Sequence, residues 1–238
     1  MRAVLTFHAI DDSGSVLSFA PRRFAALIEG LAAAAIPVVS FHDLLDQPTG
    51  VALTFDDGMA SVHRHALPVL AAHGFPAHVF LTTAAVGRDN HWPSQPAGAP
   101  RFEMLRWAEI ERCVAHGFTM EAHTATHPDL RRLSDTAIAD ECGRADDEIE
   151  RRLGRRPRLF AYPYGRADAR VQRVVAALYE ACFSTRLAYL PRQPQRHDVP
   201  RLDAYFLRSP RLHSDLFAPS TRAYIALRAA VRAARGRT

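Results

Sequence analysis

Apolar and polar residues follow two recurring patterns along this chain of 238 residues. Short apolar runs are typical of buried strands, whereas apolar residues spaced three or four positions apart are typical of amphipathic helices. Eight runs are predicted to be strands: residues 3–8, 36–41, 51–55, 77–82, 118–122, 158–163, 181–185 and 199–205. Helices are predicted between most of them and at the end, near 21–31, 61–73, 107–116, 135–153, 169–180 and 224–235.

This alternation of strands with helices predicts an α/β fold built on a parallel sheet. Seven or eight strand–helix units are enough for a (β/α) barrel, which we expect to be closed or nearly closed. We assign residues 1–218 to a catalytic barrel and residues 219–238 to a C-terminal basic helix or tail. Such barrels carry their chemistry at the carboxyl ends of the strands, so the functional residues are sought there.

The helical periodicities predict which side chains are buried. The long helix that begins after Ser134 has one apolar stripe, made of Ile138, Cys142, Ala145, Ile149 and Leu153. Its Asp, Glu and Arg residues are expected to face solvent. The last helix is expected to pack on the barrel through Tyr224, Leu227 and Val231. Its Arg228, Arg232 and Arg235 then share a face, for which contact with an anionic membrane is the less favoured alternative.

Composition and charge narrow the class of protein only a little. All 30 basic residues are Arg, and the net charge of +5 weakly favours an anionic substrate or surface without indicating nucleic acid. The three cysteines form no Cys-x-x-Cys pair and are expected to be reduced core residues. The sequence shows neither a signal peptide nor an apolar run long enough to span a membrane. We therefore expect a cytoplasmic protein, of undetermined oligomeric state.

Two predicted strands end in groups that bind metals. The run 51–55 is followed by Asp56, Asp57 and a glycine, and the run 118–122 leads into His123, with His127 four residues later. Two imidazoles and one carboxylate form a ligand set that leaves positions for water and substrate. Each motif alone also has a structural interpretation, because Asp-Asp-Gly is a common turn sequence and a pair of histidines can be unrelated.

Taken together, the motifs resemble those of the polysaccharide deacetylases of carbohydrate esterase family 4, the NodB-homology domain. Thr54-Phe55-Asp56-Asp57-Gly58 matches the first family motif, and His123-Thr124-x-x-His127 matches the second. Phe160-Ala161-Tyr162-Pro163-Tyr164-Gly165 resembles the third. The three motifs occur in family order, and the resemblance covers about residues 3–205.

The resemblance implies an enzyme that removes N-acetyl groups from an amino-sugar-containing glycan or glycan precursor. By this resemblance Asp57, His123 and His127 bind a divalent metal, zinc first, with Co, Ni or Mn as alternatives. Asp56 is the general base, and the backbone N–H of Tyr164 contributes to the oxyanion hole. These roles suit amide hydrolysis, because a metal lowers the pKa of bound water and a backbone donor stabilises the tetrahedral oxyanion.

Two departures from the family pattern lead to further hypotheses. The Arg that normally begins the third motif and orients the base is replaced by Ala161, and we propose that Arg201 takes its place. The usual C-terminal motif that supplies a catalytic-acid His is not evident. Leu5-Thr6-Phe7-His8 has the form of that motif at the other end of the chain, as in the permuted poly-N-acetylglucosamine deacetylases, which this sequence also resembles. We therefore predict that His8 is the catalytic acid, because the first and last strands of a closed barrel are neighbours.

The substrate itself is less well defined by the sequence. Tyr162, Pro163 and Arg201 are candidate substrate contacts, and so is Trp92, which lies in a long predicted loop over residues 87–101. Three other functions compete: hydrolysis of a small formamide, acetamide or ureide on the same fold, non-haem iron oxygenation, and sugar binding without catalysis. The α/β alternation argues against the oxygenase, and the presence of Asp56 argues against a pure binding protein.

Overall fold

The computed structural model describes residues 1–95, 98–213 and 215–235. Seven parallel strands form a closed barrel, in which each strand pairs with the next in the sequence and the last pairs with the first. The strands are β1 (Arg2–Phe7), β2 (Gly50–Phe55), β3 (Ala77–Leu81), β4 (Phe118–Ala122), β5 (Leu159–Ala161), β6 (Ala181–Leu187) and β7 (Val199–Asp203). The predicted (β/α) barrel is therefore confirmed, with seven strands.

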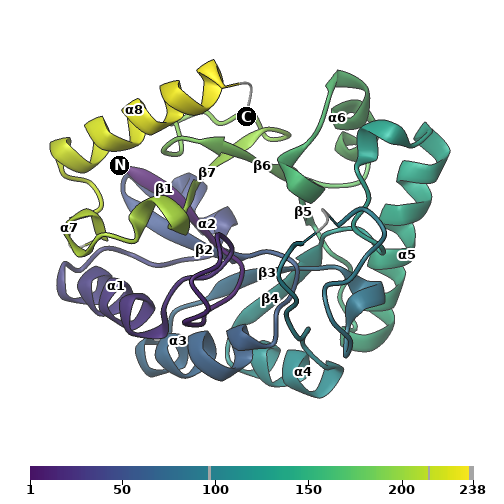
Figure 1. Ribbon diagram of the computed structural model, residues 1–238, viewed down its shortest axis with the longest axis horizontal. Helices are drawn as coiled ribbons and strands as arrows, with labels where there is room; N and C mark the ends of the chain where they lie inside the picture. Colours follow the sequence, from purple (N-terminus) through teal and green to yellow (C-terminus); the bar gives the residue numbers. More distant parts are fainter. Residues whose placement is uncertain (96–97, 214, 236–238) are drawn as a thin grey trace.

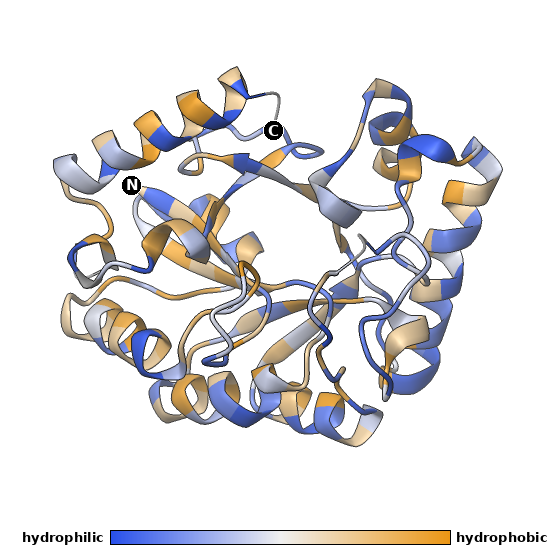
Figure 2. Ribbon diagram, in the orientation of Figure 1, coloured by the Kyte–Doolittle hydropathy of each residue, from blue (hydrophilic) through white to orange (hydrophobic). Residues whose placement is uncertain are grey.

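Helices surround this barrel (Figure 1). The α-helices are α1 (Pro21–Ala33), α2 (Phe41–Asp46), α3 (Leu67–His73), α4 (Trp107–Ala115), α5 (Asp135–Leu153), α6 (Ala169–Ala176), α7 (Pro210–His213) and α8 (Pro219–Ala234). Shorter turns are the π-helix η1 (Val62–Ala66) and the 3-10 helices η2 (Thr83–Ala85), η3 (Leu130–Arg132), η4 (Pro163–Gly165) and η5 (Ala204–Leu207). The outer helices carry both hydrophobic and hydrophilic residues (Figure 2), as amphipathic helices on a barrel must. None of the helices in the described ranges is long and apolar enough to cross a bilayer.

The predicted strand over residues 36–41 is wrong. In this segment only Val38 forms a bridge, to Val51, and two backbone hydrogen bonds join it to β2. Pro37 has no N–H to donate to a ladder, and Ser40 caps the start of α2 by accepting a hydrogen bond from the N–H of Asp43. The barrel therefore has one strand fewer than the apolar runs indicate.

Alternation along each strand separates two cores. One cluster combines residues at alternate strand positions and fills the barrel: Val4, Ala52, Phe80, Leu159, Ala161, Phe183 and Val199. The other positions face the helices and join a larger cluster, which includes Leu5, Phe7, Leu53, Phe55, Val79 and Leu81. Polar residues at inward-facing positions therefore lie inside the barrel or at its mouth, and this applies to Thr54, Arg201 and the residues that follow the strands.

The junction between β4 and β5 depends on a buried side chain. Only one residue pair, Ala122 with Phe160, connects these two strands. The carboxylate of Glu121 instead accepts hydrogen bonds from the N–H groups of Arg158 and Leu159, at 2.8 and 3.0 Å. Burial raises the pKa of Glu121, but hydrogen bonding and charge from His78 and Arg155 outweigh burial and lower it. Glu121 thus supplies the acceptors that a regular ladder would provide.

Two predictions about helix faces need correction. On α5, Glu141 and Asp146 are buried, although the charged residues of this helix were expected to face solvent. On α8 the predicted helix is present, but Leu227 is 63% exposed and does not pack on the barrel. Thr221 and Ile225 face the core instead. The apolar pattern alone therefore does not show which charged residues of α5 are buried, or which face of α8 packs on the core.

Candidate active site

The predicted site residues converge at the carboxyl end of the barrel. Asp56 and Asp57 follow β2, and His123 follows β4. Tyr164 follows β5, and His8 follows β1. Arg201 is different, because it lies within β7 and points into the barrel toward Asp56. Residues that are far apart in the sequence are brought together because parallel strands end at one edge of the barrel.

Asp57, His123 and His127 form a compact group of buried donor atoms. The Nε2 atoms of His123 and His127 lie 3.3 and 3.4 Å from Oδ1 of Asp57, and 3.2 Å from each other. Within the described chain, this is the group of three or more His, Cys, Asp or Glu side chains whose spacing suits a metal ion. Ligands about 2.0–2.1 Å from a tetrahedral zinc ion lie roughly 3.3–3.4 Å apart, so the spacing fits such an ion.

The hydrogen bonds around this group favour metal binding. Nδ1 of His123 lies 2.7 Å from the carbonyl oxygen of Ala161, to which it donates, and this leaves Nε2 as the free lone pair. Oδ1 of Asp57 is buried and has no hydrogen-bond partner within the described residues. An unsatisfied carboxylate oxygen in a buried position is costly unless a cation faces it. The residues present therefore fit the metal that the sequence motifs imply.

The electrostatics of Asp57 and His127 point the same way. Burial raises the pKa of Asp57, but the adjacent imidazoles of His123 and His127 outweigh burial and hold the pKa well below its ordinary value. Burial lowers the pKa of both histidines. In His123 the interaction with Asp57 prevails and raises the pKa, whereas in His127 burial prevails and lowers it. Asp57 is therefore an anionic ligand, and His127 is biased toward the neutral form that binds metals.

The backbone is strained at the turns that carry these residues. Five residues other than glycine have a positive φ in the described chain, and four of them belong to the site: Asp57 (70°), Thr124 (66°), His127 (58°) and Tyr164 (60°). Each such residue costs about 1–3 kcal/mol, so the surrounding structure must hold it in place. Clustering of this strain at one end of the barrel is typical of a functional site.

Helix α5 holds the turn between the two histidines. The carboxylate of Glu141 accepts hydrogen bonds from the N–H of Thr126 at 2.8 Å and from its hydroxyl at 3.0 Å. The backbone carbonyl of Glu141 accepts a further bond from the N–H of Ala125. Sequence reasoning missed this residue because a Glu on an amphipathic helix normally reads as solvent-facing. Its position on the same helical stripe as Ile138 and Cys142 was the available signal.

An aromatic clamp encloses His127 from the side of the long loop. The Trp92 ring lies 4.3 Å from the His127 ring, and the Tyr164 ring lies 4.5 Å away at a steep angle. Nε1 of Trp92 donates to the Tyr164 hydroxyl, which in turn donates to the carbonyl oxygen of Ser94. The Ser94 hydroxyl donates to the carbonyl of His127 at 2.5 Å. Trp92 is 8% exposed, so most of its ring packs inside the protein beside His127, and its predicted contact with substrate stays a prediction.

Asp56 is held by Arg201 in a two-pronged salt bridge inside the barrel. Both guanidinium Nη atoms donate to the carboxylate, each at 2.7 Å, and Nε donates to the carbonyl oxygen of Ser184. Burial raises the pKa of Asp56, but the charge and hydrogen bonds of Arg201 outweigh it and lower the pKa. The contact between Arg201 and Asp56 expected from the sequence is therefore present. Arg201 is 1% exposed, and its predicted contact with substrate stays a prediction.

His8 lies at the rim beside the same carboxylate. Its Nε2 is 4.0 Å from Oδ2 of Asp56, and its side chain is 22% exposed. His8 therefore lies next to Asp56 and is accessible from solvent, and its role as the acid stays a prediction. The strand β1, which His8 follows, pairs with β7 next to Arg201, through Leu5 with Leu202.

The remaining predicted substrate contacts, Tyr162 and Pro163, lie in different surroundings. Tyr162 is 1% exposed, packs among residues between the barrel and α5 and α6, and donates its hydroxyl to the carbonyl of His197. The ring of Tyr162 therefore packs outside the barrel, and its predicted contact with substrate stays a prediction. Pro163 is buried at the start of η4, beside the strained Tyr164, where its role stays a prediction.

Comparison with known proteins adds the family. A sequence model of polysaccharide deacetylases matches residues 46–180, which include Asp56, Asp57, His123 and His127. Chitin deacetylases of Colletotrichum lindemuthianum and Pestalotiopsis sp are 29% and 27% identical over 126 and 154 residues, or 53% and 61% of this chain. The chain spans less than half the length of these curated relatives, 46% and 47%.

Two solved structures resemble the whole barrel. IcaB from Ammonifex degensii superimposes with a TM-score of 0.73 at 25% identity, covering 94% of this chain and 96% of that one. The deacetylase PplD of Streptococcus pyogenes, solved with acetate, has a TM-score of 0.78 at 20% identity, covering 91% and 98%, and supports the fold. Because the family model matches more than half of the chain, this protein belongs to the polysaccharide deacetylase family.

Proposed function

We propose that this protein is a metal-dependent hydrolase that removes N-acetyl groups from an amino-sugar-containing glycan or glycan precursor. One observation carries the proposal: a buried metal-ligand group, Asp57, His123 and His127, lies next to an Asp that does not belong to it. Asp56 is instead fixed by Arg201. A carboxylate that lies beside the metal ligands without being one of them is suited to accept a proton from attacking water.

The first chemical step is the attack of water on the amide carbonyl. A divalent ion on Asp57, His123 and His127, when bound, would lower the pKa of water and polarise the carbonyl. Asp56 accepts the proton that the water loses as its oxygen bonds to the carbonyl carbon. The salt bridge to Arg201 fixes the direction of the carboxylate. The backbone N–H of Tyr164, at a turn with a φ of 60°, is assigned to the oxyanion that forms.

The second step breaks the bond between carbon and nitrogen. His8 donates a proton to the sugar nitrogen, so that an amine leaves instead of an amide anion, and acetate remains. The products balance as one acetate and one free amino group for each water consumed. The position of His8, partly exposed and 4.0 Å from Asp56, supports this assignment. This position would also let His8 and Asp56 exchange protons between turnovers.

The proposal is tested by measuring acetate release from N-acetylglucosamine oligomers, polymers and O-acetylated glycans, with and without a chelator. We expect release from N-acetylated substrates, loss of activity with chelator, and recovery when zinc or cobalt is added. Release that is insensitive to chelator would contradict the metal, and release only from small formamides or ureides would contradict the substrate class.

A further inference from the structure

The two histidines of the metal group lie on one short irregular segment, residues 123–127, which we call the histidine turn. It follows β4 and is not helical, and its Thr124 and His127 have positive φ values of 66° and 58°. A regular helix would itself place two residues four positions apart on one face, but an irregular turn does not. The spacing of His123 and His127 is therefore set by the contacts that hold this turn.

Neighbouring segments hold the histidine turn by hydrogen bonds to its backbone. The segment η2 donates two N–H groups to carbonyls of the turn, and the Ser94 hydroxyl donates to the carbonyl of His127. Helix α5 accepts N–H groups of the turn. The carbonyl of Glu141 accepts that of Ala125 at 3.1 Å, and its carboxylate accepts that of Thr126 at 2.8 Å. Glu141 thus holds the two residues that directly precede His127.

The carboxylate of Glu141 is bonded on both oxygens. Oε2 accepts the N–H of Thr126, and Oε1 accepts the Thr126 hydroxyl at 3.0 Å and an N–H of the Arg144 guanidinium. Nε of Arg144 also donates to Asp140, at 3.0 Å. Glu141 is 7% exposed, and a buried carboxylate is costly unless it is paired and hydrogen-bonded in this way. With both oxygens engaged, the carboxylate fixes the position of the Thr126 backbone.

The two histidine rings are oriented in different ways. Nδ1 of His123 lies 2.7 Å from a backbone carbonyl of β5, the kind of second bond that orients most metal-binding histidines. Nδ1 of His127 is buried and has no hydrogen-bond partner within the described residues. Packing against Trp92 and Tyr164 limits rotation of the His127 ring. The location of this ring therefore depends on its own backbone, which is held next to Glu141.

We propose that Glu141 is a positioning residue, which sets the affinity of the site for its metal by holding His127 through the backbone of Thr126. The proposal rests on the proposed function and adds a determinant of metal affinity outside the ligand group. Movement of the Thr126 backbone would displace Nε2 of His127 from its distances of 3.4 Å to Asp57 and 3.2 Å to His123. Groups that orient metal ligands typically contribute about 10–100-fold in metal affinity.

Two substitutions separate the position of the Glu141 carboxylate from its charge. E141Q keeps the length of the side chain and can bond both the N–H and the hydroxyl of Thr126, but it removes the negative charge. E141D keeps the charge but is one methylene shorter, so its carboxylate is withdrawn from Thr126. We expect E141Q to bind zinc with nearly wild-type affinity, and E141D to bind it at least about tenfold more weakly. A loss in E141Q equal to or greater than that in E141D would assign the effect to charge and overturn the proposal.

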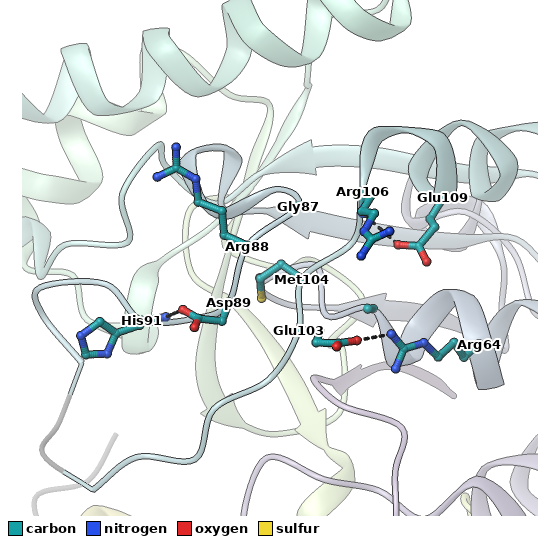
Figure 3. Close-up of a pocket in the computed structure, with 10 residues that line it drawn as sticks. Arg64, Gly87, Arg88, Asp89, His91, Glu103, Met104, Arg106 and Glu109 are labelled. Carbon is teal, nitrogen blue, oxygen red and sulfur yellow. Dashed lines mark hydrogen bonds and ion pairs between the residues drawn. The ribbon is translucent and has the colours of Figure 1, made fainter.

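Zinc affinity is measured on purified protein stripped of metal, by competition with a chromogenic chelator, and melting temperature is measured with and without zinc. E109Q and E109D are the matched controls. Glu109 on α4 also accepts a backbone N–H, that of Arg106 at 2.9 Å, but it does so beside a separate cavity of about 580 Å³ (Figure 3). The controls should leave zinc affinity unchanged. Equal zinc affinity of wild type and both Glu141 variants would overturn the proposal, even if the metal-free proteins melt at different temperatures.

Thr126→Val tests the same contact from the other side and does not depend on the folding of the Glu141 variants. Valine removes the hydroxyl that Glu141 accepts and leaves the backbone N–H in place. We expect a smaller loss of zinc affinity than in E141D, and a changed visible spectrum of bound Co(II), which reports coordination geometry. Because both substitutions act on one contact, T126V/E141D should bind zinc no more weakly than E141D. Wild-type zinc affinity and an unchanged Co(II) spectrum in T126V would contradict the proposal.

The same measurements separate the role of Glu141 from the proposed function. Zinc binding by the wild type without acetate release from any substrate would refute the proposed reaction, while the comparison of E141Q with E141D would still decide the role of Glu141. Acetate release with equal zinc affinity in all Glu141 variants would refute the positioning role alone. Failure of the wild type to bind zinc, cobalt, nickel or manganese would refute both.

Discussion

The rim of the barrel is built from two regions that differ in how their chemistry is encoded. The region from β2 to β5 carries Asp56, Asp57, His123 and His127, all within the residues that the family model matches. The seam where β7 meets β1 carries Arg201 and His8, and both lie outside that match. The first region is defined by local motifs on strained turns, whereas the second is defined by closure of the barrel.

Position in space explains how Arg201 can stand in for a residue on another strand. Ala161 on β5 and Arg201 on β7 both occupy inward-facing positions, on either side of β6. From there the guanidinium of Arg201 passes near the rings of Phe80 and Phe183, 5.8 and 5.9 Å from their centroids, to reach Asp56. The barrel interior is shared by all strands, so a long side chain can serve the same carboxylate from several of them.

The largest expected effect belongs to the region from β2 to β5, which we call the motif region. In H123A/H127A the metal group loses both nitrogen ligands, so we expect metal to be absent after purification and turnover to fall to background. Metal content by plasma mass spectrometry and acetate release are the measurements. H65A is the control, because His65 is exposed on η1. A double variant with normal metal content or normal turnover would contradict the assignment of the ligands.

Asp56→Asn tests the base. Asp56 belongs to the motif region, but Arg201, at the seam of β7 and β1, holds its carboxylate. The amide cannot accept the proton from water, and loss of a general base typically costs 10²–10⁴-fold in rate. Metal content should be unchanged, since Asp56 is not in the ligand group. Turnover close to that of wild type would show that the proton goes elsewhere.

His8→Ala tests the acid at the seam. We expect turnover of N-acetyl substrates to fall by about 10²-fold with metal retained, since a general acid contributes at least this much. An acetyl ester with a 4-nitrophenol leaving group needs no protonation to depart. The loss should therefore be much smaller on this ester for His8→Ala, and undiminished for Asp56→Asn. Equal losses on the two substrates would remove His8 from the role of acid.

Arg201→Lys separates the charge of Arg201 from its geometry. A lysine cannot make the two parallel hydrogen bonds to Asp56, so we expect kcat/KM to fall by roughly 10–100-fold, as for other residues that orient catalytic groups. Weaker donation lets the pKa of Asp56 rise, so the acidic limb of the pH profile should move to higher pH. Arg186→Lys, at an exposed ion pair with Asp198, is the control. A fall in stability with an unchanged pH profile would mean that Arg201 is only structural.

The same difference, between local motifs and closure of the barrel, determines how much of each region the sequence predicts. Asp57, His123 and His127 could be predicted because each belongs to a short motif at the end of an apolar run. The contact of Arg201 with Asp56 followed only from the assumption of a closed barrel. The strand at 36–41 was overpredicted because its apolar residues pack beside β2 without a full ladder. Glu141 was not predicted, because the partner of a charged residue on a helix lies on a distant segment.

The smallest expected effect on activity concerns α5, which supports the segment from β2 to β5 from behind. Asp146 on α5 is buried, and its Oδ1 accepts a hydrogen bond from the Tyr179 hydroxyl at 2.9 Å. Burial raises the pKa of Asp146 from 3.8 to about 7, against the opposing effects of Tyr179 and Arg156. The folded state therefore holds this proton more tightly than the unfolded state. Stability from this group is fully present below pH 4 and declines as the pH rises from about 4 to 7.

Asp146→Asn removes that decline while keeping the shape and the acceptor for Tyr179. We expect the variant and wild type to unfold at similar denaturant concentrations near pH 4, and the variant to be more stable at pH 8 by up to about 4 kcal/mol. Taking the difference between the two proteins at each pH cancels the pH dependence of metal binding, which both share. Asp147→Asn is the control, since Asp147 is exposed and also pairs with Arg156. A constant difference between Asp146→Asn and wild type from pH 4 to 8 would show that Asp146 is ionised in the folded protein. The support that α5 gives to the histidine turn would then come from Glu141, without a buried proton on Asp146.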